Sequence, residues 1–397
     1  MIPSDIRSDF PLLSKVCYLD SAATSLSPEP VLDAMLDYEH NFRANSGRGV
    51  HRLAQQASQK YRDAHQNVRK FIHADEEGEL VFTRNSTEAI NMVASGLTWQ
   101  KGDQVVATLF EHHSNLLPWM RVRDRHGIDL RLISPAKDGM LDPSALEVLI
   151  SNKTRLVAIT QVSNVLGNIV PIREFAKICQ DYGTLLLVDG SQSVPHIPVD
   201  VKRLGCDFLC FSGHKMLGPT GTGVLFMKNP GLEPLLLGGG GVERVTAAGY
   251  TLTNGYERYE AGTPNISGVI GLDKAIDYLK SLGMEDIQHH EQKITRLIIK
   301  ELSGIENVEI IGPGPIGDRI GVISFVIKGV NPHDVAIMLD GEANVMVRSG
   351  HHCCMPLMEY LCLPEGTVRA SLHCYNTIED AELLVDTVRA IAEDFPS

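Results

Sequence analysis

The sequence predicts an α/β protein in which a mainly parallel sheet lies between helices. Apolar runs rich in β-branched residues recur between residues 80 and 212, and segments with helical spacing of apolar residues separate them. Strands buried on both faces of a parallel sheet have this continuous apolar character, and the helices between them supply the crossovers. Polar residues follow most of the runs, which places them at the carboxyl edge of the sheet, where open α/β sheets bind ligands. The predicted strands are 80–85, 104–110, 129–134, 155–161, 184–189 and 207–212.

The composition of the chain limits its expected partners, its location and the state of its cysteines. The chain has 397 residues, enough for about two or three domains, and a net charge of −13 without any Lys/Arg-rich run. We therefore expect neither nucleic acid nor an anionic membrane as a partner. The N-terminus lacks a basic and apolar signal pattern, and no apolar run reaches the roughly 18 residues of a spanning helix, so a cytoplasmic location is expected. Eight irregularly spaced cysteines favour reduced thiols over a disulfide framework or a zinc site.

The first 71 residues read as a packing segment followed by helices. Prolines interrupt residues 1–30, within which 18–24 resembles a strand that enters a turn of small residues. Such a turn can bring backbone close to a ligand. Helical spacing then runs from Pro30 to Phe71, broken by a loop at 45–51 that contains Arg48 and His51.

A helix start follows the first predicted strand. Asn85 is placed as an N-cap with Glu88 three residues later, so the amides of Ser86 and Thr87 lie in the first turn. A helix N-terminus with two hydroxyls beside it binds anions, phosphate above all. Taken alone, the pattern also fits an ordinary cap.

Lys215 stands just after the predicted strand 207–212, in a loop rich in Gly, Pro and Thr. Lysine forms Schiff bases with carbonyl cofactors, so we hypothesise that Lys215 carries pyridoxal phosphate; a solvated loop lysine is the alternative. Asp189 ends the most apolar strand, where a carboxylate needs a partner, and it is placed to face a pyridine nitrogen. His112, after the strand 104–110, supplies a ring that could stack on the cofactor.

The remainder of the chain predicts a smaller α+β domain. A helix-rich span runs to about Leu302, and strand patterns follow at 308–313, 319–327 and 367–372. We expect residues 1–14 to be an N-terminal segment that packs on the small domain. Residues 15–281 are expected to form the large cofactor-binding domain, and 282–397 the small C-terminal domain.

Several ordered motifs together resemble one family. They are EHHSN at 111–115, SNVLG at 163–167, DGSQS at 189–193, SGHK at 212–215, EAGTPN at 260–265 and RSGHHCCMP at 348–356. Over nearly its whole length the chain resembles the group II (Suf-type) cysteine desulfurases and selenocysteine lyases, in the class V aminotransferase branch of fold-type I pyridoxal-phosphate enzymes. The resemblance implies the fold-type I architecture: a large domain with a mainly parallel seven-stranded sheet between helices, plus a smaller α+β C-terminal domain carrying the catalytic cysteine loop.

The resemblance also implies roles for individual residues. Lys215 would hold the cofactor as a Schiff base, Asp189 would pair with the pyridinium, Gln192 would bond the phenolic oxygen, and His112 would stack on the ring. Cys353 matches the family's nucleophile, and its catalytic partners would be Lys215 and His112. The implied phosphate ligands are Ser86, Thr87, Ser212, His214 and, from a second subunit, Thr263. The implied substrate-binding residues are Asn164, which also borders the cofactor, Arg369, and Arg348 on the cysteine loop.

The implied reaction converts L-cysteine to L-alanine and leaves sulfane sulfur as a persulfide on Cys353. A homodimer and an acceptor or scaffold protein of iron–sulfur cluster assembly would be the protein partners, and no metal is expected. Alternatives are a selenocysteine lyase, a class V aminotransferase, or a cofactor-binding docking subunit. The chain departs from the family pattern at Gly47, where histidine is frequent, and at Cys354, where alanine is common.

Overall fold

The large sheet has seven strands in a computed structural model that describes residues 6–47, 49–74, 78–136, 138–229, 231–314 and 319–395. Its order is β2-β8-β7-β6-β5-β3-β4. The strands from β7 to β4 run parallel, whereas β8 is antiparallel to both of its neighbours. The bounds are β2 Glu79–Thr83, β3 Gln104–Thr108, β4 Asp129–Ile133, β5 Thr154–Thr160, β6 Leu185–Asp189, β7 Phe208–Ser212 and β8 Gly223–Met227. The predicted α/β fold with a mainly parallel sheet is confirmed.

Strand β8 corrects the sequence interpretation. No strand is expected at 223–227 from the sequence, but this apolar run, Gly223–Met227, is buried throughout and inserts between β2 and β7. An antiparallel return strand needs only a tight turn and no crossover helix, so the alternation of strands and helices does not reveal it.

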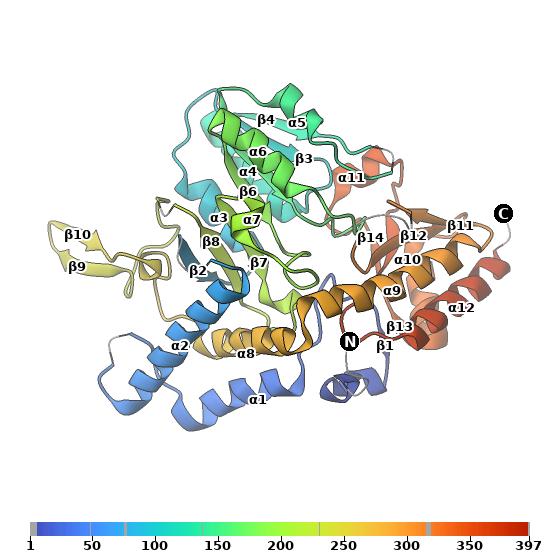
Figure 1. Ribbon diagram of the computed structural model, residues 1–397, viewed down its shortest axis with the longest axis horizontal. Coiled ribbons are helices and arrows are strands. Elements are labelled where there is room, and N and C mark those ends of the chain that lie inside the picture. Colours follow the sequence, from blue (N-terminus) through green and yellow to red (C-terminus); the bar gives the residue numbers. More distant parts are fainter. Residues whose placement is uncertain are drawn as a thin grey trace.

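Helices pack on both faces of the large sheet (Figure 1). In α6 the buried residues Ile172, Phe175, Ala176 and Cys179 form one stripe at helical spacing, and the helix ends at Gly183 in the left-handed conformation. The helices associated with this part are α1 Glu29–Asp37, α2 Arg52–Phe71, α3 Ser86–Gly96, α4 Leu117–His126, α5 Ser144–Leu149, α6 Ile172–Tyr182, α7 Val201–Leu204 and α8 Ile266–Leu282.

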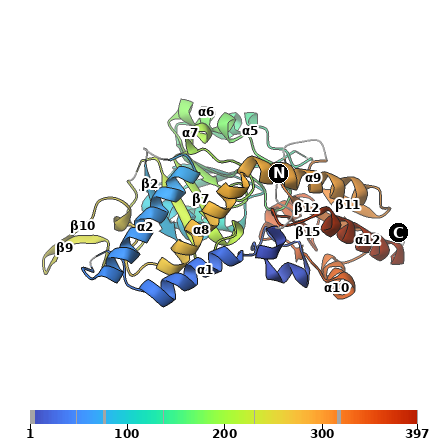
Figure 2. The same cartoon turned by 60° about the horizontal axis from the view of Figure 1, so that its bottom comes forward.

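A second core lies at the end of the molecule where α9 and α12 pack together (Figures 1 and 2). Its antiparallel sheet has the order β11-β12-β15-β14. The strands are β11 Val308–Ile311, β12 Val322–Ile327, β14 Arg348–Gly350 and β15 Thr367–Ser371; the helices are α9 Met284–Ser303, α10 Pro332–Ala343, α11 Met355–Tyr360 and α12 Ile378–Asp394. At the opposite end, β9 Val242–Thr246 and β10 Gly249–Leu252 form a projecting hairpin (Figure 1).

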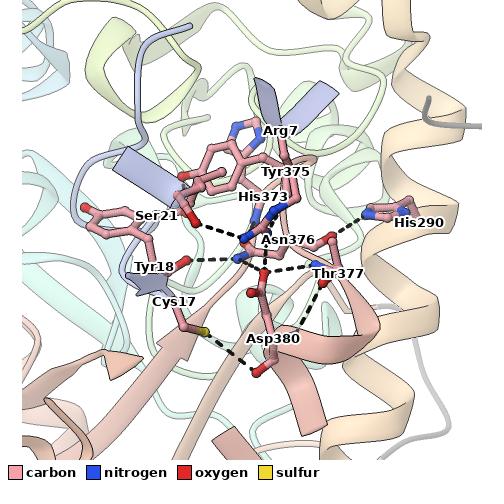
Figure 3. Close-up of polar contacts among 11 residues, drawn as sticks. Arg7, Cys17, Tyr18, Ser21, His290, His373, Tyr375, Asn376, Thr377 and Asp380 are labelled. Carbon is pink, nitrogen blue, oxygen red and sulfur yellow. Dashed lines mark hydrogen bonds and ion pairs between the residues drawn. The ribbon is translucent and has the colours of Figure 1, made fainter. Parts of the chain in front are cut away.

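The N-terminal segment joins the two parts. Its two short 3-10 helices are η1 Ile6–Asp9 and η2 Pro11–Ser14, and β1 Cys17–Tyr18 pairs in parallel with β13 Val345–Met346. Arg7 forms an ion pair of 2.7 Å with Asp380 of α12 (Figure 3). The ring of Phe10 packs edge-to-face against Tyr278 on α8 and at a tilt against Tyr375 after β15, so one aromatic side chain touches both parts.

Within the described ranges, no helix is both long and apolar enough to cross a lipid bilayer.

Candidate functional site

A cavity of about 160 Å³ opens at the carboxyl edge of the large sheet, where the second core faces it. It brings together nearly all of the site residues expected from the sequence. They are Ser86, Thr87, His112, Asn164, Asp189, Gln192, Ser212, His214, Lys215, Arg348 and Arg369. Ala22 and Ala23 also line it, so the small-residue turn does approach the site as predicted.

The N-terminus of α3 forms one wall. Asn85 caps the helix by accepting the amide of Glu88 at 3.0 Å, as expected from the sequence. The amide of Ser86 donates to Ser212 Oγ at 2.8 Å, and the hydroxyls of Thr87 and Ser114 bond at 2.7 Å. This wall therefore combines helix-terminal amides with hydroxyls from three elements, the donor set that suits a phosphate.

Lys215 ends the short 3-10 turn η5 Gly213–Lys215, directly after β7. The pKa of its amine is lowered to about 8, mainly by burial and also by the charges of Arg369 and Arg348, although Asp189 opposes the shift. A substantial fraction of neutral amine therefore exists near neutral pH, which is the form that attacks a carbonyl carbon.

Asp189 and Gln192 form the floor beneath the cavity. Asp189 is 4% exposed at the end of β6, and its Oδ1 accepts the amide of Ser191 at 3.0 Å. Gln192 donates from Nε2 to Ala22 O at 2.9 Å. Its Oε1 and the hydroxyl of Ser191 are buried without a partner among the described residues. Because buried polar atoms are normally bonded, these two atoms indicate a polar ligand in the cavity.

His112 stands at the rim as a neutral ring. Its Nδ1 accepts the amide of Ser114 at 3.1 Å, and burial lowers its pKa to about 3, helped by the charge of Lys215. Behind it, Glu111 is fully buried, accepts bonds from Thr108, Asn115 and Thr160, and has its pKa raised to about 8 by burial. A neutral imidazole can stack on an aromatic ligand without adding charge.

Cys353 lies between β14 and α11, half-buried, with its Sγ 3.5 Å from Arg348 Nη2. The loop is a tight turn, because His352 and Cys353 have φ angles of 51° and 58°. Two groups from the large-sheet side hold it: Asn164 Nδ2 donates to His352 O at 2.9 Å, and the His113 amide donates to Cys353 O at 2.8 Å. The turn is thus fixed from outside, as left-handed non-glycine residues require.

The two histidines before the thiol bond groups other than the sulfur. The Nε2 atoms of His351 and His352 bond Pro364 O and Thr367 Oγ1. Cys354 is buried in the protein, and a left-handed turn, not an extended strand, separates the two thiols.

Two of the expected site residues, Cys353 and Thr263, are not among the residues that line the cavity. Thr263 is exposed in the turn before α8 and is absent from the lining of this chain's own cavity. Gly47 is exposed with φ of 100°, and the neighbouring Arg48 lies outside the described residues.

Sequence reasoning missed one charged neighbour of the site. Arg369 Nη2 pairs with Asp20 Oδ1 at 3.0 Å, and Arg369 Nη1 donates to Asn164 O at 3.0 Å. Asp20 is the carboxylate of the turn at 18–24 that was expected to approach a ligand, so the signal was present in that prediction.

Comparisons with known proteins agree with this geometry. The family model described as "Aminotransferase class-V" matches residues 17–384. A "Probable cysteine desulfurase" of Methanothermobacter thermautotrophicus is 46% identical over 99% of this chain and 98% of its own length. One from Pyrococcus abyssi is 44% identical over 100% and 99% of the two chains.

Two solved structures are similar throughout. The apo cysteine desulfurase of Thermococcus onnurineus NA1 has a TM-score of 0.96 and 44% identity, covering 100% of this chain and 99% of its own. The cysteine desulfurase CsdA of Escherichia coli, with an S-sulfonic acid, has a TM-score of 0.92 and 32% identity over 100% of both chains.

Proposed function

This chain belongs to the class V aminotransferase family and is a pyridoxal-phosphate-dependent cysteine desulfurase, and we propose that its reaction runs between Lys215 and Cys353. The observation that supports this division of roles most directly is the convergence on one cavity. Lys215 lines it from the large sheet, and Arg348, whose guanidinium contacts the Cys353 sulfur, lines it from the second core.

The residues present fit the cofactor. The α3 amides and the hydroxyls of Ser86, Thr87 and Ser212, with His214, would hold its phosphate. Gln192 Oε1 and Ser191 Oγ, which are buried and have no partner in the part of the chain that the structure describes, would face its polar ring atoms, and Asp189 would lie against the ring nitrogen. His112 would cover the ring face. When bound, pyridoxal phosphate supplies an electron sink that stabilises negative charge at the substrate's Cα.

The side of the cavity lined by Arg348 and Arg369 would recognise the substrate. Arg369 is buried and held by Asp20 and Asn164 O, which leaves further N–H groups for a carboxylate. We infer that Arg369 and Asn164 bind the carboxylate of L-cysteine. Arg348 lines the same cavity and contacts the Cys353 sulfur, so it can orient both the substrate and the thiol.

Two side chains carry out the transfer. Lys215 Nζ, neutral in a large fraction near pH 8, takes and returns the Cα proton. Cys353 Sγ attacks the substrate sulfur: an S–S bond forms, the substrate C–S bond breaks, and the carbon gains a proton. L-cysteine and the thiol of Cys353 thereby become L-alanine and a Cys353 persulfide. The guanidinium of Arg348 stabilises negative charge on the attacking sulfur.

The proposal extends to the subgroup of the enzyme, its oligomeric state and its protein partners. We infer a group II, Suf-type enzyme that is a cytoplasmic homodimer, in which the exposed Thr263 completes the phosphate site of the second subunit. An acceptor or scaffold protein of iron–sulfur assembly would remove the persulfide sulfur. We also retain the division into a segment at 1–14, a large domain at 15–281 and a small domain at 282–397.

A product assay tests the function. Purified protein given L-cysteine and a reducing thiol is expected to release sulfide and L-alanine in equal amounts. Without the reductant, a single turnover should leave one additional sulfur atom on the peptide containing Cys353. Cys362→Ala, at an exposed free thiol, is the matched control and should behave as wild type. Unchanged sulfide release from Cys353→Ala would refute the assigned role of Cys353.

A further inference from the structure

Arg369 is 1% exposed, so the few groups that contact its guanidinium set the orientation in which it can bind a ligand. A guanidinium has five N–H donors in a fixed plane. The described contacts use one on Nη1, to Asn164 O, and one on Nη2, to Asp20 Oδ1, each at 3.0 Å. Nε is buried and has no partner among the described residues. Asp20 is thus the carboxylate that orients this cation, with part of the plane left for a ligand.

The backbone aligns Asp20 with Arg369. Ser371 donates its amide to Leu19 O at 2.7 Å and accepts the amide of Ser21 at 3.3 Å, which makes a parallel bridge between Asp20 and Ser371. Arg369 and Ser371 lie two residues apart on β15, so their side chains leave the same face. The ion pair therefore spans two segments whose relative position the backbone already sets.

Side-chain contacts on both sides of Asp20 fix this segment further (Figure 3). Tyr18 O accepts Asn376 Nδ2 at 2.9 Å, and the hydroxyls of Ser21 and Tyr375 bond at 2.7 Å. These contacts hold the backbone on both sides of Asp20, so its carboxylate can move only by rotation of its own side chain. Asp20 is consequently anchored on a fixed segment, as the support of an oriented binding group should be.

We propose that Asp20 is a positioning residue for substrate recognition, holding the Arg369 guanidinium at the angle at which its remaining N–H groups receive the carboxylate of the amino-acid substrate. The inference rests on the proposed function, in which Arg369 binds that carboxylate. It adds a residue that touches neither the substrate nor the cofactor.

The charges show how Asp20 would affect binding of the substrate carboxylate. Asp20 and the substrate carboxylate are both negative, so Asp20 adds no attraction of its own, and its contribution is the orientation of Arg369. Asp20→Asn keeps an acceptor oxygen for Nη2 but removes the charge, whereas Asp20→Ala removes both. An orienting role therefore predicts that asparagine rescues what alanine loses.

Equilibrium binding of two small amines tests this inference. L-alanine carries the carboxylate, and ethylamine is the same molecule without it; binding of each is followed by the absorbance change of the cofactor-loaded protein. Asp20→Ala should weaken L-alanine binding about tenfold and leave ethylamine binding within about twofold. Asp20→Asn should bind L-alanine within about threefold of wild type, or more tightly. For L-cysteine, the alanine variant should change KM more than kcat.

Asp129→Asn is the matched control, because it removes the carboxylate of an exposed ion pair with Arg131 at the edge of the large sheet. Thermal unfolding of each variant verifies the fold. Equal losses for both amines, equal losses in the asparagine and alanine variants, or no loss would each overturn the positioning role. If wild type releases sulfide and alanine from L-cysteine, such a result leaves the proposed function standing. If wild type forms neither product, the proposed function fails and this inference fails with it.

Discussion

Arg348 Nη2, from the first residue of β14, lies 3.5 Å from the Sγ of Cys353 in the turn between β14 and α11. A guanidinium at that distance can donate to the sulfur and interact with negative charge on it during its attack. Both histidines of the turn bond elsewhere, and burial holds the pKa of His352 well below its usual value. Arg348 is therefore the charged side chain that contacts the nucleophile in the described structure.

We expect Arg348→Ala to slow alkylation of Cys353 by iodoacetamide by about threefold to tenfold at pH 7. This measurement needs no substrate, so it separates an effect on the thiol from an effect on substrate binding. Arg389→Ala, which removes an exposed ion pair with Asp386 on α12, is the control and should leave the rate unchanged. Equal alkylation rates in Arg348→Ala and wild type would show that Arg348 does not activate the sulfur.

Lys215 should give cofactor loading a distinctive pH dependence. With a pKa of about 8, about a quarter of the amine is neutral at pH 7.5, compared with about one part in a thousand at the usual value of 10.5. Because the neutral amine attacks the aldehyde, the loading rate of the cofactor-free protein should rise with pH, with a midpoint near pH 8, and level off roughly one pH unit above it. Stopped-flow absorbance at several pH values measures the midpoint.

Two variants check the assignment to Lys215. Asp189→Asn should move the midpoint to lower pH, because Asp189 raises the pKa of Lys215. Lys215→Ala should leave no covalent cofactor after borohydride reduction, whereas Lys300→Ala, at an exposed surface lysine, should load normally. A covalent adduct in Lys215→Ala would mean that another lysine holds the cofactor.

Gly223 should control how closely β8 approaches the N-terminus of α3, the proposed phosphate site. A Cβ at this first residue of β8 would lie 2.5 Å from Asn85 Cα and 2.7 Å from Asn85 C, both backbone atoms of the α3 cap. Gly223→Ala is expected to destabilise the fold by about 1–3 kcal/mol and to weaken cofactor binding. Gly249→Ala, at the first residue of β10 with nothing within 4 Å, should be nearly neutral. Urea unfolding and cofactor titration measure both effects, and equal stability of the two variants would contradict the close-approach argument.

The parts of the site that the sequence predicted depend on local patterns of residues. The α3 cap follows from Asn85 and Glu88, three residues apart, and the placement of Asp189 and Lys215 follows from the ends of apolar strands. In a parallel sheet those ends meet at one edge, so a one-dimensional pattern is sufficient to bring the residues together. The specific roles came from the family motifs and not from spacing.

The sequence could not predict the features of the site that depend on contacts between distant segments. Asp20 and Arg369 are 349 positions apart, and only the pairing of Leu19–Ser21 with Ser371 brings them together. The left-handed turn at His352 and Cys353 contains no glycine at either position and depends on contacts from Asn164 and His113. No local propensity encodes either arrangement, because each depends on two distant segments docking first.

The two adjacent thiols should behave differently. Cys353 is half-buried beside Arg348, whereas Cys354 is 0% exposed. Burial raises the pKa of Cys354, and the charge of Glu111 raises it further, so this thiol remains protonated and unreactive. We expect Cys353→Ala to lose sulfide release from L-cysteine by at least about a hundredfold, while Cys354→Ala stays within a few-fold of wild type.

Peptide mass spectrometry after a single turnover locates the transferred sulfur. In wild type and in Cys354→Ala, the additional sulfur atom should be on Cys353. A relay in which Cys354 takes the sulfur from Cys353 predicts instead that Cys354→Ala accumulates persulfide but releases sulfide slowly. The buried position of Cys354 argues against the relay, because an acceptor thiol would have to reach it through the packed core around Leu357 and Met358. Sulfur found on Cys354 in the Cys353→Ala protein would show that burial does not exclude Cys354 from the reaction, and that the assignment of Cys353 is wrong.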